Sequence, residues 1–256
     1  MNNKLKSRDD RLIRLNKFLS VAGVTSRRRA DEFIKEGRVS INGKVVTLLG
    51  TKIDPGRDRI SVDGKVVKVE NRKVYVLLNK PKDTITTASD ERGRKNIFDL
   101  VNIGMRVFSI GRLDRNTTGV LLLTNDGELA NRLMHPRFHV LKVYKATLDK
   151  PLVDRDIMRF RRGIEIDGAM VVPDDIYILE NSGGLEVGIS VHEGKHHLVR
   201  RFFESLGYRV VQLDRYSYGG ITHRGLSRGE WRYLTPKEVI NLKKLVGLQD
   251  AAGKGV

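Results

Sequence analysis

The chain of 256 residues contains no cysteine, which excludes disulfide bonds and metal sites built on thiolates. It also has no apolar run approaching about 18 residues, so the sequence predicts no membrane-spanning helix. The charged residues at the N-terminus are not followed by an apolar stretch, so no secretory signal is predicted there. From these absences we expect a cytoplasmic protein that does not engage a membrane.

Acidic residues are scarce relative to basic ones. The chain has 31 Asp and Glu against 48 Lys and Arg, which gives a formal net charge of +17 and a pI near 10.1. Such a charge indicates a polyanionic partner; nucleic acid is the usual one, and an anionic membrane surface is the alternative. Residues 1–72 hold 18 basic and 9 acidic residues, about half of the excess. This asymmetry suggests a separate basic module at the front of the chain.

Common cofactor motifs are missing as well. There is no P-loop and no G-x-G-x-x-G after a strand, so nucleotide hydrolysis and a Rossmann methyltransferase lack support. Residues 192–196 do match the zinc-protease pattern H-E-x-x-H, which works only on a helix. Here His192 ends an alternating strand and Gly194 predicts a turn. We therefore expect no metal and no cofactor; a metal hydrolase built on these histidines is the alternative that a chelator would reveal.

The front module predicts two short helices. Residues 15–22 carry apolar side chains at helical spacing, and a second helix is predicted from the cap Ser26 to Gly37. The apolar stripe of the second helix leaves Arg28 and Lys35 on the opposite face, where they can meet RNA phosphates. Asn-Gly at 42–43 and Asp-Gly at 63–64 predict two β-hairpins. We place an RNA-binding domain at 10–60 and a linker at 61–72.

The rest of the chain alternates strands with few helices. Strands are predicted within 73–81, 106–111, 119–126, 139–148, 175–181, 185–194 and 209–216. Helices are predicted at 126–135, 195–207 and 235–247, with a candidate fourth around 154–160. This pattern favours an α+β fold built on a mixed, largely antiparallel sheet. We assign 73–246 to one domain and 247–256 to a flexible tail.

The most informative stretch is residues 111–136, GRLDRNTTGVLLLTNDGELANRLMHP. Asp114 follows a predicted strand and a glycine, and a polar loop then leads from it into a fully apolar strand. A carboxylate at the mouth of a buried strand is a candidate reactive group. A turn aspartate bonded to local backbone would give the same pattern, and the residues alone do not separate the two readings.

The motifs together resemble a known family. Residues 111–127 resemble the aspartate signature of the pseudouridine synthases that modify ribosomal RNA, the small-subunit-type branch. Residues 77–87, 142–148 and 193–219 resemble the family's first, tyrosine and last motifs, in the expected order. Residues 11–60 resemble the RNA-binding module named after ribosomal protein S-four, an α-L-type domain. The resemblance therefore covers nearly the whole chain.

The resemblance implies a reaction and its residues. Uridine is isomerised by breaking the N1–C1′ bond, turning the base and rejoining it through C5. Asp114 is then the catalytic carboxylate, either as nucleophile or as base at the ribose. Tyr144 is implied to stack on the target base, with a strand core tyrosine as its alternative. Val199 would be apolar backing of the same pocket.

Several basic residues are implied to support this site. Arg200 resembles the family's basic partner of the aspartate, although a phosphate contact is its alternative, and Arg201 beside it fits such a contact. Arg112 resembles the residue that fills the space left by the flipped base, and a phosphate clamp is its alternative. Lys80 is expected to be structural or to contact a phosphate rather than to act as a catalyst.

This chain departs from the family pattern at two places. Asp83 stands where the first motif usually has glycine, and His196, His197 and Leu198 stand where the last motif often has Asn-Arg-Gln. These changes concern substrate contacts more than the reaction. Residues 90–101 and 128–136 resemble large-subunit enzymes, so we expect 23S rather than 16S rRNA as partner. We expect a monomer that acts on free rRNA or on an assembling subunit; a non-catalytic RNA-binding or assembly protein is the main alternative.

Overall fold

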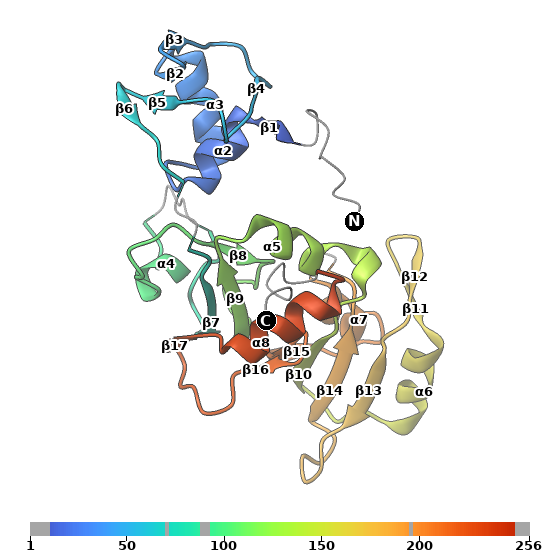
Figure 1. Ribbon diagram of the computed structural model, residues 1–256. Coiled ribbons are helices and arrows are strands. Elements are labelled where there is room, and N and C mark those ends of the chain that lie inside the picture. The colour runs from blue at the N-terminus through green and yellow to red at the C-terminus, as the bar shows by residue number, and fades with distance from the viewer. Residues whose placement is uncertain (1–10, 70–71, 88–92, 195–196, 249–256) are drawn as a thin grey trace, which may run out of the picture. The chain divides into compact units, whose positions relative to one another are not determined.

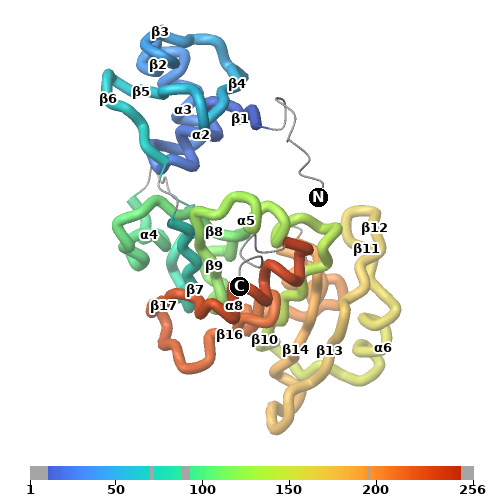
Figure 2. Tube along the Cα trace, viewed as in Figure 1, coloured from blue at the N-terminus to red at the C-terminus, as the bar shows by residue number. Residues whose placement is uncertain are grey.

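The computed structural model describes residues 11–69, 72–87, 93–194 and 197–248 (Figure 1). The chain divides into two compact units, residues 1–72 and 73–256, and each unit has its own hydrophobic core. No helix among the described residues is long and apolar enough to cross a membrane. The path of the chain through both units can be followed in Figure 2.

The first unit is a helix pair beside small sheets. Its elements are β1 (Ile13–Arg14), α2 (Leu15–Val21), α3 (Arg27–Lys35), β2 (Val39–Ile41), β3 (Lys44–Val45), β4 (Lys52–Ile53), β5 (Ile60–Val62) and β6 (Lys65–Val66). As predicted, Ser26 caps α3, because its hydroxyl accepts a hydrogen bond from the Arg29 amide at 3.1 Å. Both predicted hairpins form, with Asn42 and Asp63 at positive φ in their turns.

The second hairpin corrects one domain boundary. β5 pairs with β2 and with β6, in the sheet order β3-β2-β5-β6. Residues 61–66, which the sequence pattern assigned to the linker, therefore belong to the sheet of the first unit. The assignment was wrong because the partner strand β2 lies about twenty residues earlier, and a local pattern cannot show that pairing.

The second unit is built on one nine-stranded sheet. Along its main path the order is β13-β14-β10-β15-β9-β7-β17, with β16 on β15 and β8 on β9. The strands are β7 (Tyr75–Lys80), β8 (Phe108–Ile110), β9 (Thr118–Thr124), β10 (Lys142–Leu148), β13 (Asp175–Ile178), β14 (Glu186–Val191), β15 (Val210–Tyr218), β16 (Ile221–Thr222) and β17 (Trp231–Tyr233). Every pairing is antiparallel except β15 with β9. The predicted α+β class with a mixed, largely antiparallel sheet is confirmed.

Helices cover this sheet. They are α4 (Ile97–Leu100), α5 (Gly127–Met134), the 3-10 turn η1 (Pro136–Phe138), α6 (Asp154–Arg162), α7 (Leu198–Glu204) and α8 (Pro236–Leu245). Alternate residues of β7 and β9 pack on opposite faces: Leu77 and Leu122 pack with α5 and α8, whereas Leu78 and Leu121 pack with α4. A second two-stranded sheet, β11 (Ile164–Ile166) with β12 (Ala169–Val171), was not predicted.

Two ends differ from the predicted bounds. α7 begins at Leu198, and residues 195–196 of the predicted helix lie outside the described residues. The assigned tail begins too early, because Arg132 donates to the Gly247 carbonyl at 3.2 Å and Leu248 packs on the core. Residues 249–256 lie outside the described residues.

The parallel junction between β9 and β15 depends on one glycine. Gly119 is opposite Arg215, with φ of +104°, and a Cβ at this position would lie 2.3 Å from the Arg215 carbonyl oxygen. Only a residue without a side chain allows the two strands to approach this closely. Gly119 follows the loop that carries Asp114, so the close approach sets where this loop leaves the sheet.

Candidate active site

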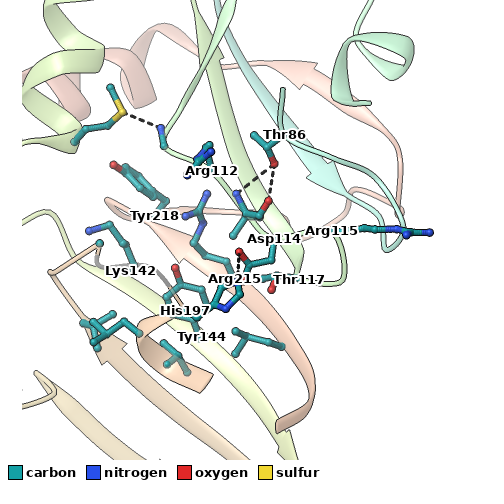
Figure 3. A pocket seen from close by; sticks show the side chains of 18 of the residues that line it. Thr86, Arg112, Asp114, Arg115, Thr117, Lys142, Tyr144, His197, Arg215 and Tyr218 are labelled. Carbon is teal, nitrogen blue, oxygen red and sulfur yellow. Dashed lines mark hydrogen bonds and ion pairs between the residues drawn. The ribbon is translucent and has the colours of Figure 1, made fainter. Parts of the chain in front are cut away.

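A pocket of about 600 Å³ opens in the second unit. The loop between β8 and β9 forms one wall, and β10, β15, the end of β14, the segment after β7 and the start of α7 also contribute residues (Figure 3). Five basic and two acidic residues line it, so its field is positive. It takes residues from segments far apart in the sequence, as expected of a site assembled by the fold.

Asp114 lies in the loop that forms the first wall. Its side chain is 38% exposed, and its Oδ1 lies 3.1 Å from Nε2 of His197. His197 precedes α7 with φ of +53°, a left-handed conformation that is unfavourable for residues other than glycine. The predicted carboxylate therefore faces the pocket, and a residue from the motif that departs from the family pattern holds one of its oxygens.

Lys80 fixes the backbone of the Asp114 loop. Its side chain is fully buried, and Nζ donates to the carbonyls of Pro81, Asp114, Arg115 and Thr117 at 2.9 to 3.1 Å. Burial lowers the pKa of Lys80 to about 8, and the nearby Asp114 opposes this shift. Contact with a phosphate of the substrate, the alternative considered for Lys80, is therefore wrong. Its buried hydrogen bonds agree with the structural role expected from the sequence.

Thr86 holds the same loop from the other end. Its hydroxyl donates to the Leu113 carbonyl at 2.7 Å and accepts from the Leu113 amide at 3.3 Å. The Thr117 amide donates to the Asp114 carbonyl at 3.1 Å, which closes the turn. The backbone on both sides of Asp114 is thus tied to buried groups, and its carboxylate is held in place before any ligand binds.

Arg200 does not take the place expected for it. Its Nη1 donates to the Val210 carbonyl at 2.7 Å, and Arg200 is not among the residues that line the pocket. Instead, Arg215 of β15 lines the pocket and is only 2% exposed. The expectation that Arg200 pairs with Asp114 is therefore wrong. α7 turns Leu198 and Val199 toward the pocket and leaves Arg200 beside β15.

Tyr144, Val199 and Arg112 all line the pocket, as expected. Tyr144 is half-buried on β10, Val199 is buried at the start of α7, and Arg112 is exposed two residues before Asp114. The pocket therefore offers an aromatic ring, an apolar wall and an exposed cation beside its carboxylate. Figure 3 shows Asp114 and Tyr144 with the other labelled polar side chains around the cavity.

Two further residues of the pocket were missed by sequence reasoning. Lys142 lies two residues before Tyr144 on β10, and Tyr218 lies on β15 beside Arg215. Arg215 and Tyr218 are three residues apart, a spacing that normally puts side chains on opposite faces of a strand. A β-bulge changes this: Lys142 pairs with Tyr218 and Tyr144 with Arg215, so β15 has one extra residue between the pairs. No local pattern could have shown this pairing.

His192 of the H-E-x-x-H match contacts an aspartate and another histidine. Nδ1 of His192 lies 2.8 Å from an Asp174 carboxylate oxygen, and its ring packs on His139 with centroids 4.6 Å apart. His196 lies outside the described residues. Over the described part of the chain, no three His, Asp or Glu side chains gather as metal ligands.

The residues assigned to RNA binding differ in their surroundings. Arg28 and Lys35 are exposed on α3. Arg201 on α7 forms an ion pair with Asp167 in the β11–β12 turn, so part of its charge is already compensated. Asp83, at the unusual position of the first motif, has φ of +58° and pairs with Arg115 at 3.3 Å.

Comparison with known proteins gives consistent matches. The family model described as RNA pseudouridylate synthase matches residues 74–205, and the S4 domain model matches residues 13–58. The chain is 46% identical to an uncharacterized RNA pseudouridine synthase of Aquifex aeolicus, over 93% of this chain and 96% of that protein. It is 44% identical to ribosomal large subunit pseudouridine synthase B of Bacillus subtilis, over 91% and 96%.

A more distant relative and a solved structure agree with these matches. Dual-specificity RNA pseudouridine synthase RluF of Shigella flexneri is 36% identical, over 93% of this chain and 80% of that protein. A crystal structure described as pseudouridylate synthase superposes with a TM-score of 0.66 at 30% identity, covering 90% of this chain and 99% of the other.

Proposed function

Because the chain belongs to the RNA pseudouridylate synthase family, we propose that it converts uridine to pseudouridine in ribosomal RNA, with Asp114 as catalytic residue. The observation that carries this assignment is the position of Asp114. It is a partly exposed carboxylate on a loop fixed by Lys80, and it faces a cationic pocket that contains Tyr144.

The chemistry of the isomerisation fits one carboxylate. The bond from N1 of uracil to C1′ of the ribose breaks, the base turns, and C5 bonds to C1′. Asp114 can attack C1′ or remove a proton from the ribose, and both routes need an ionised carboxylate close to the sugar. A glycosidase needs a second carboxyl to protonate a departing alcohol, whereas here the base stays in the pocket.

The remaining residues of the pocket suit a flipped nucleotide. A base that is paired in RNA must leave its helix before it can reach Asp114, at a cost of a few kcal/mol. We propose that Tyr144 stacks on the uracil and that Val199 supports it from the apolar side. Arg112 at the exposed edge either fills the space left in the RNA or holds a phosphate.

We propose 23S rRNA as the substrate. The name of the Bacillus subtilis relative assigns that protein to the large ribosomal subunit, and it matches this chain nearly from end to end. The S4 domain adds a basic surface with Arg28 and Lys35, which supports RNA binding ahead of the catalytic unit. We further propose that the protein acts in the cytoplasm as a monomer, on free rRNA or on an assembling subunit.

The test is to map pseudouridine in rRNA from cells with and without the protein. We expect at least one pseudouridine of 23S rRNA to disappear with the gene and to return with the wild-type chain. It should not return with Asp114→Asn. An unchanged map in both subunits would favour the alternative, an RNA-binding or assembly protein without catalysis.

A further inference from the structure

The bottom of the pocket holds two buried cations around one aromatic ring. Lys142 is 8% exposed and Arg215 is 2% exposed. The Lys142 ammonium lies 5.8 Å from the centre of the Tyr218 ring, and the Arg215 guanidinium lies 5.0 Å from it. The bulge between β10 and β15 brings these three residues and Tyr144 to the same pocket. Two of the five basic residues that line the pocket are therefore buried, and they lie in the same pocket as the proposed base-stacking tyrosine.

Backbone carbonyls accept hydrogen bonds from both cations. Lys142 donates to the carbonyls of His192 and Glu193 at 2.5 and 3.2 Å, and Arg215 Nε donates to the Val120 carbonyl at 2.7 Å. Neither makes an ion pair with a carboxylate among the described residues. Arg215 Nη2 is buried and has no hydrogen-bond partner in the described part of the chain. A buried N–H without a partner is costly, so the hydrogen bonds of Arg215 with the described residues do not fully compensate its burial.

Burial of these residues shifts the pKa values of Lys142 and Tyr218. Burial, and then the neighbouring Arg215, lower the pKa of Lys142 to about 8, and the charges of Asp174 and Glu193 oppose this shift. Burial raises the pKa of Tyr218 to about 12, so this phenol stays neutral, and its hydroxyl donates to the Leu133 carbonyl at 2.8 Å. Below about pH 8 this part of the pocket therefore carries the positive charges of Lys142 and Arg215 beside a neutral phenol.

We propose that Arg215 and Lys142 form an anion site for the detached uracil. When the C1′–N1 bond breaks, its electron pair goes to N1 and spreads over O2 and O4, so the base carries one negative charge. Meanwhile Asp114 bonds to C1′ or takes a proton from the ribose. When C5 bonds to C1′ with an electron pair of the base, Asp114 leaves C1′ or returns the proton. C5 then loses its proton and N1 gains one. Fixed cations at the developing charge lower the barrier for the first step.

A phosphate of the RNA is the other anion that could meet these cations. The backbone continues on both sides of a flipped nucleotide, so its phosphates stay near the mouth of the pocket, where Arg112 and Arg115 are exposed. The base, in contrast, is the part of a flipped nucleotide that lies farthest from the backbone, so it can reach Arg215 and Tyr218. The burial of these residues therefore favours the base over the phosphate.

The proposal rests on the uridine isomerisation proposed above, and a change of leaving group tests it. Single-turnover rates would be measured on one rRNA fragment with uridine or 5-fluorouridine at the target position, following consumption of the target nucleoside. Fluorine withdraws electrons, so the detached base is a weaker base and needs less help from the protein. Arg215→Gln should lower the single-turnover rate on the uridine RNA by about 10²- to 10³-fold. Its effect on the rate with the fluorinated RNA should be at least tenfold smaller.

Matched variants separate this role from a structural one. Arg112→Gln removes a cation from the pocket edge and should lower the single-turnover rates on both RNAs by the same factor. Arg215→Lys keeps the charge and should recover part of the loss. If the melting curve shows that Arg215→Gln does not fold, the rates on the two RNAs are compared for Lys142→Gln instead.

The outcomes are distinguishable. An equal loss on both RNAs with Arg215→Gln would show a phosphate or packing role and overturn the anion site while leaving the proposed function intact. A wild-type protein that converts neither RNA would overturn the proposed function and the anion site together.

Discussion

Replacing Gly119 by alanine tests whether the β9–β15 junction builds the site. The new Cβ would lie 2.3 Å from the Arg215 carbonyl oxygen and 2.6 Å from Asp214 Oδ1. Ordinary van der Waals separations begin at 3.4 Å, so the strands would have to separate by about 1 Å. β15 also pairs with β10 on its other side, so such a shift disturbs two strand pairs.

The expected cost has two parts. A side chain at positive φ costs roughly 1–2 kcal/mol, and the forced separation adds a comparable or larger amount. We therefore expect Gly119→Ala to destabilise the protein by about 3–5 kcal/mol, which for a chain of this size lowers Tm by roughly 6–20 °C. Single-turnover activity should fall as well, because Arg215 and the Asp114 loop move with the strands.

Gly220→Ala is the matched control for this experiment. Gly220 has φ of +84° but no atom within 4 Å of the position of a Cβ. It should therefore show only the conformational cost of roughly 1–2 kcal/mol. Thermal melting of the two variants is the assay. Equal losses of stability would refute the argument that close strand approach at Gly119 positions the site.

Three further predictions concern ionisation, RNA binding and metal. Turnover should fall as pH rises through about 8, because Lys80 and Lys142 then lose the protons that they donate to backbone carbonyls; a rate that is constant from pH 7 to 10 would contradict this. Both lysines have a folded-state pKa below the unfolded value of 10.5, so their contribution to stability rises between about pH 8 and 10.5, and the loss of rate should occur without unfolding. The double variant Arg28→Gln, Lys35→Gln should lower the salt dependence of RNA binding by roughly 0.7–0.9 log–log units for each phosphate that the protein no longer binds, and an unchanged slope in a salt titration would place the phosphate-binding residues elsewhere. Excess EDTA should leave the single-turnover rate unchanged, whereas a loss that zinc restores would point to the metal-hydrolase alternative.

Local features of the fold were predictable from the sequence. The caps of α3 and α8 are short-range hydrogen bonds, at Ser26 and Thr235, and each depends on residues within one turn. The turn of the β11–β12 hairpin is equally local, since it contains the pair Asp167-Gly168 between two short apolar segments. That signal was present and was overlooked.

Pairings between distant segments were not predictable in the same way. Arg200 and Arg215 both belong to the last motif, and which of them reaches the pocket depends on where α7 begins and on the bulge between β15 and β10. Lys80 looks like a surface cation in the sequence, and it is buried only because four backbone carbonyls, three of them from a later loop, surround its ammonium. The motifs therefore predict the loop and its carboxylate. Which charged residues surround them depends on tertiary contacts that the motifs do not show.

The central claim is that Asp114 performs chemistry rather than holding RNA. Asp114→Asn keeps the size of the side chain and removes both the nucleophile and the base. Single-turnover isomerisation on an rRNA fragment, measured beside a binding titration, is the most direct test. We expect near-total loss of pseudouridine formation with RNA affinity nearly unchanged, because binding depends on basic residues elsewhere. Normal turnover by Asp114→Asn, or an equal loss of binding and turnover, would contradict it.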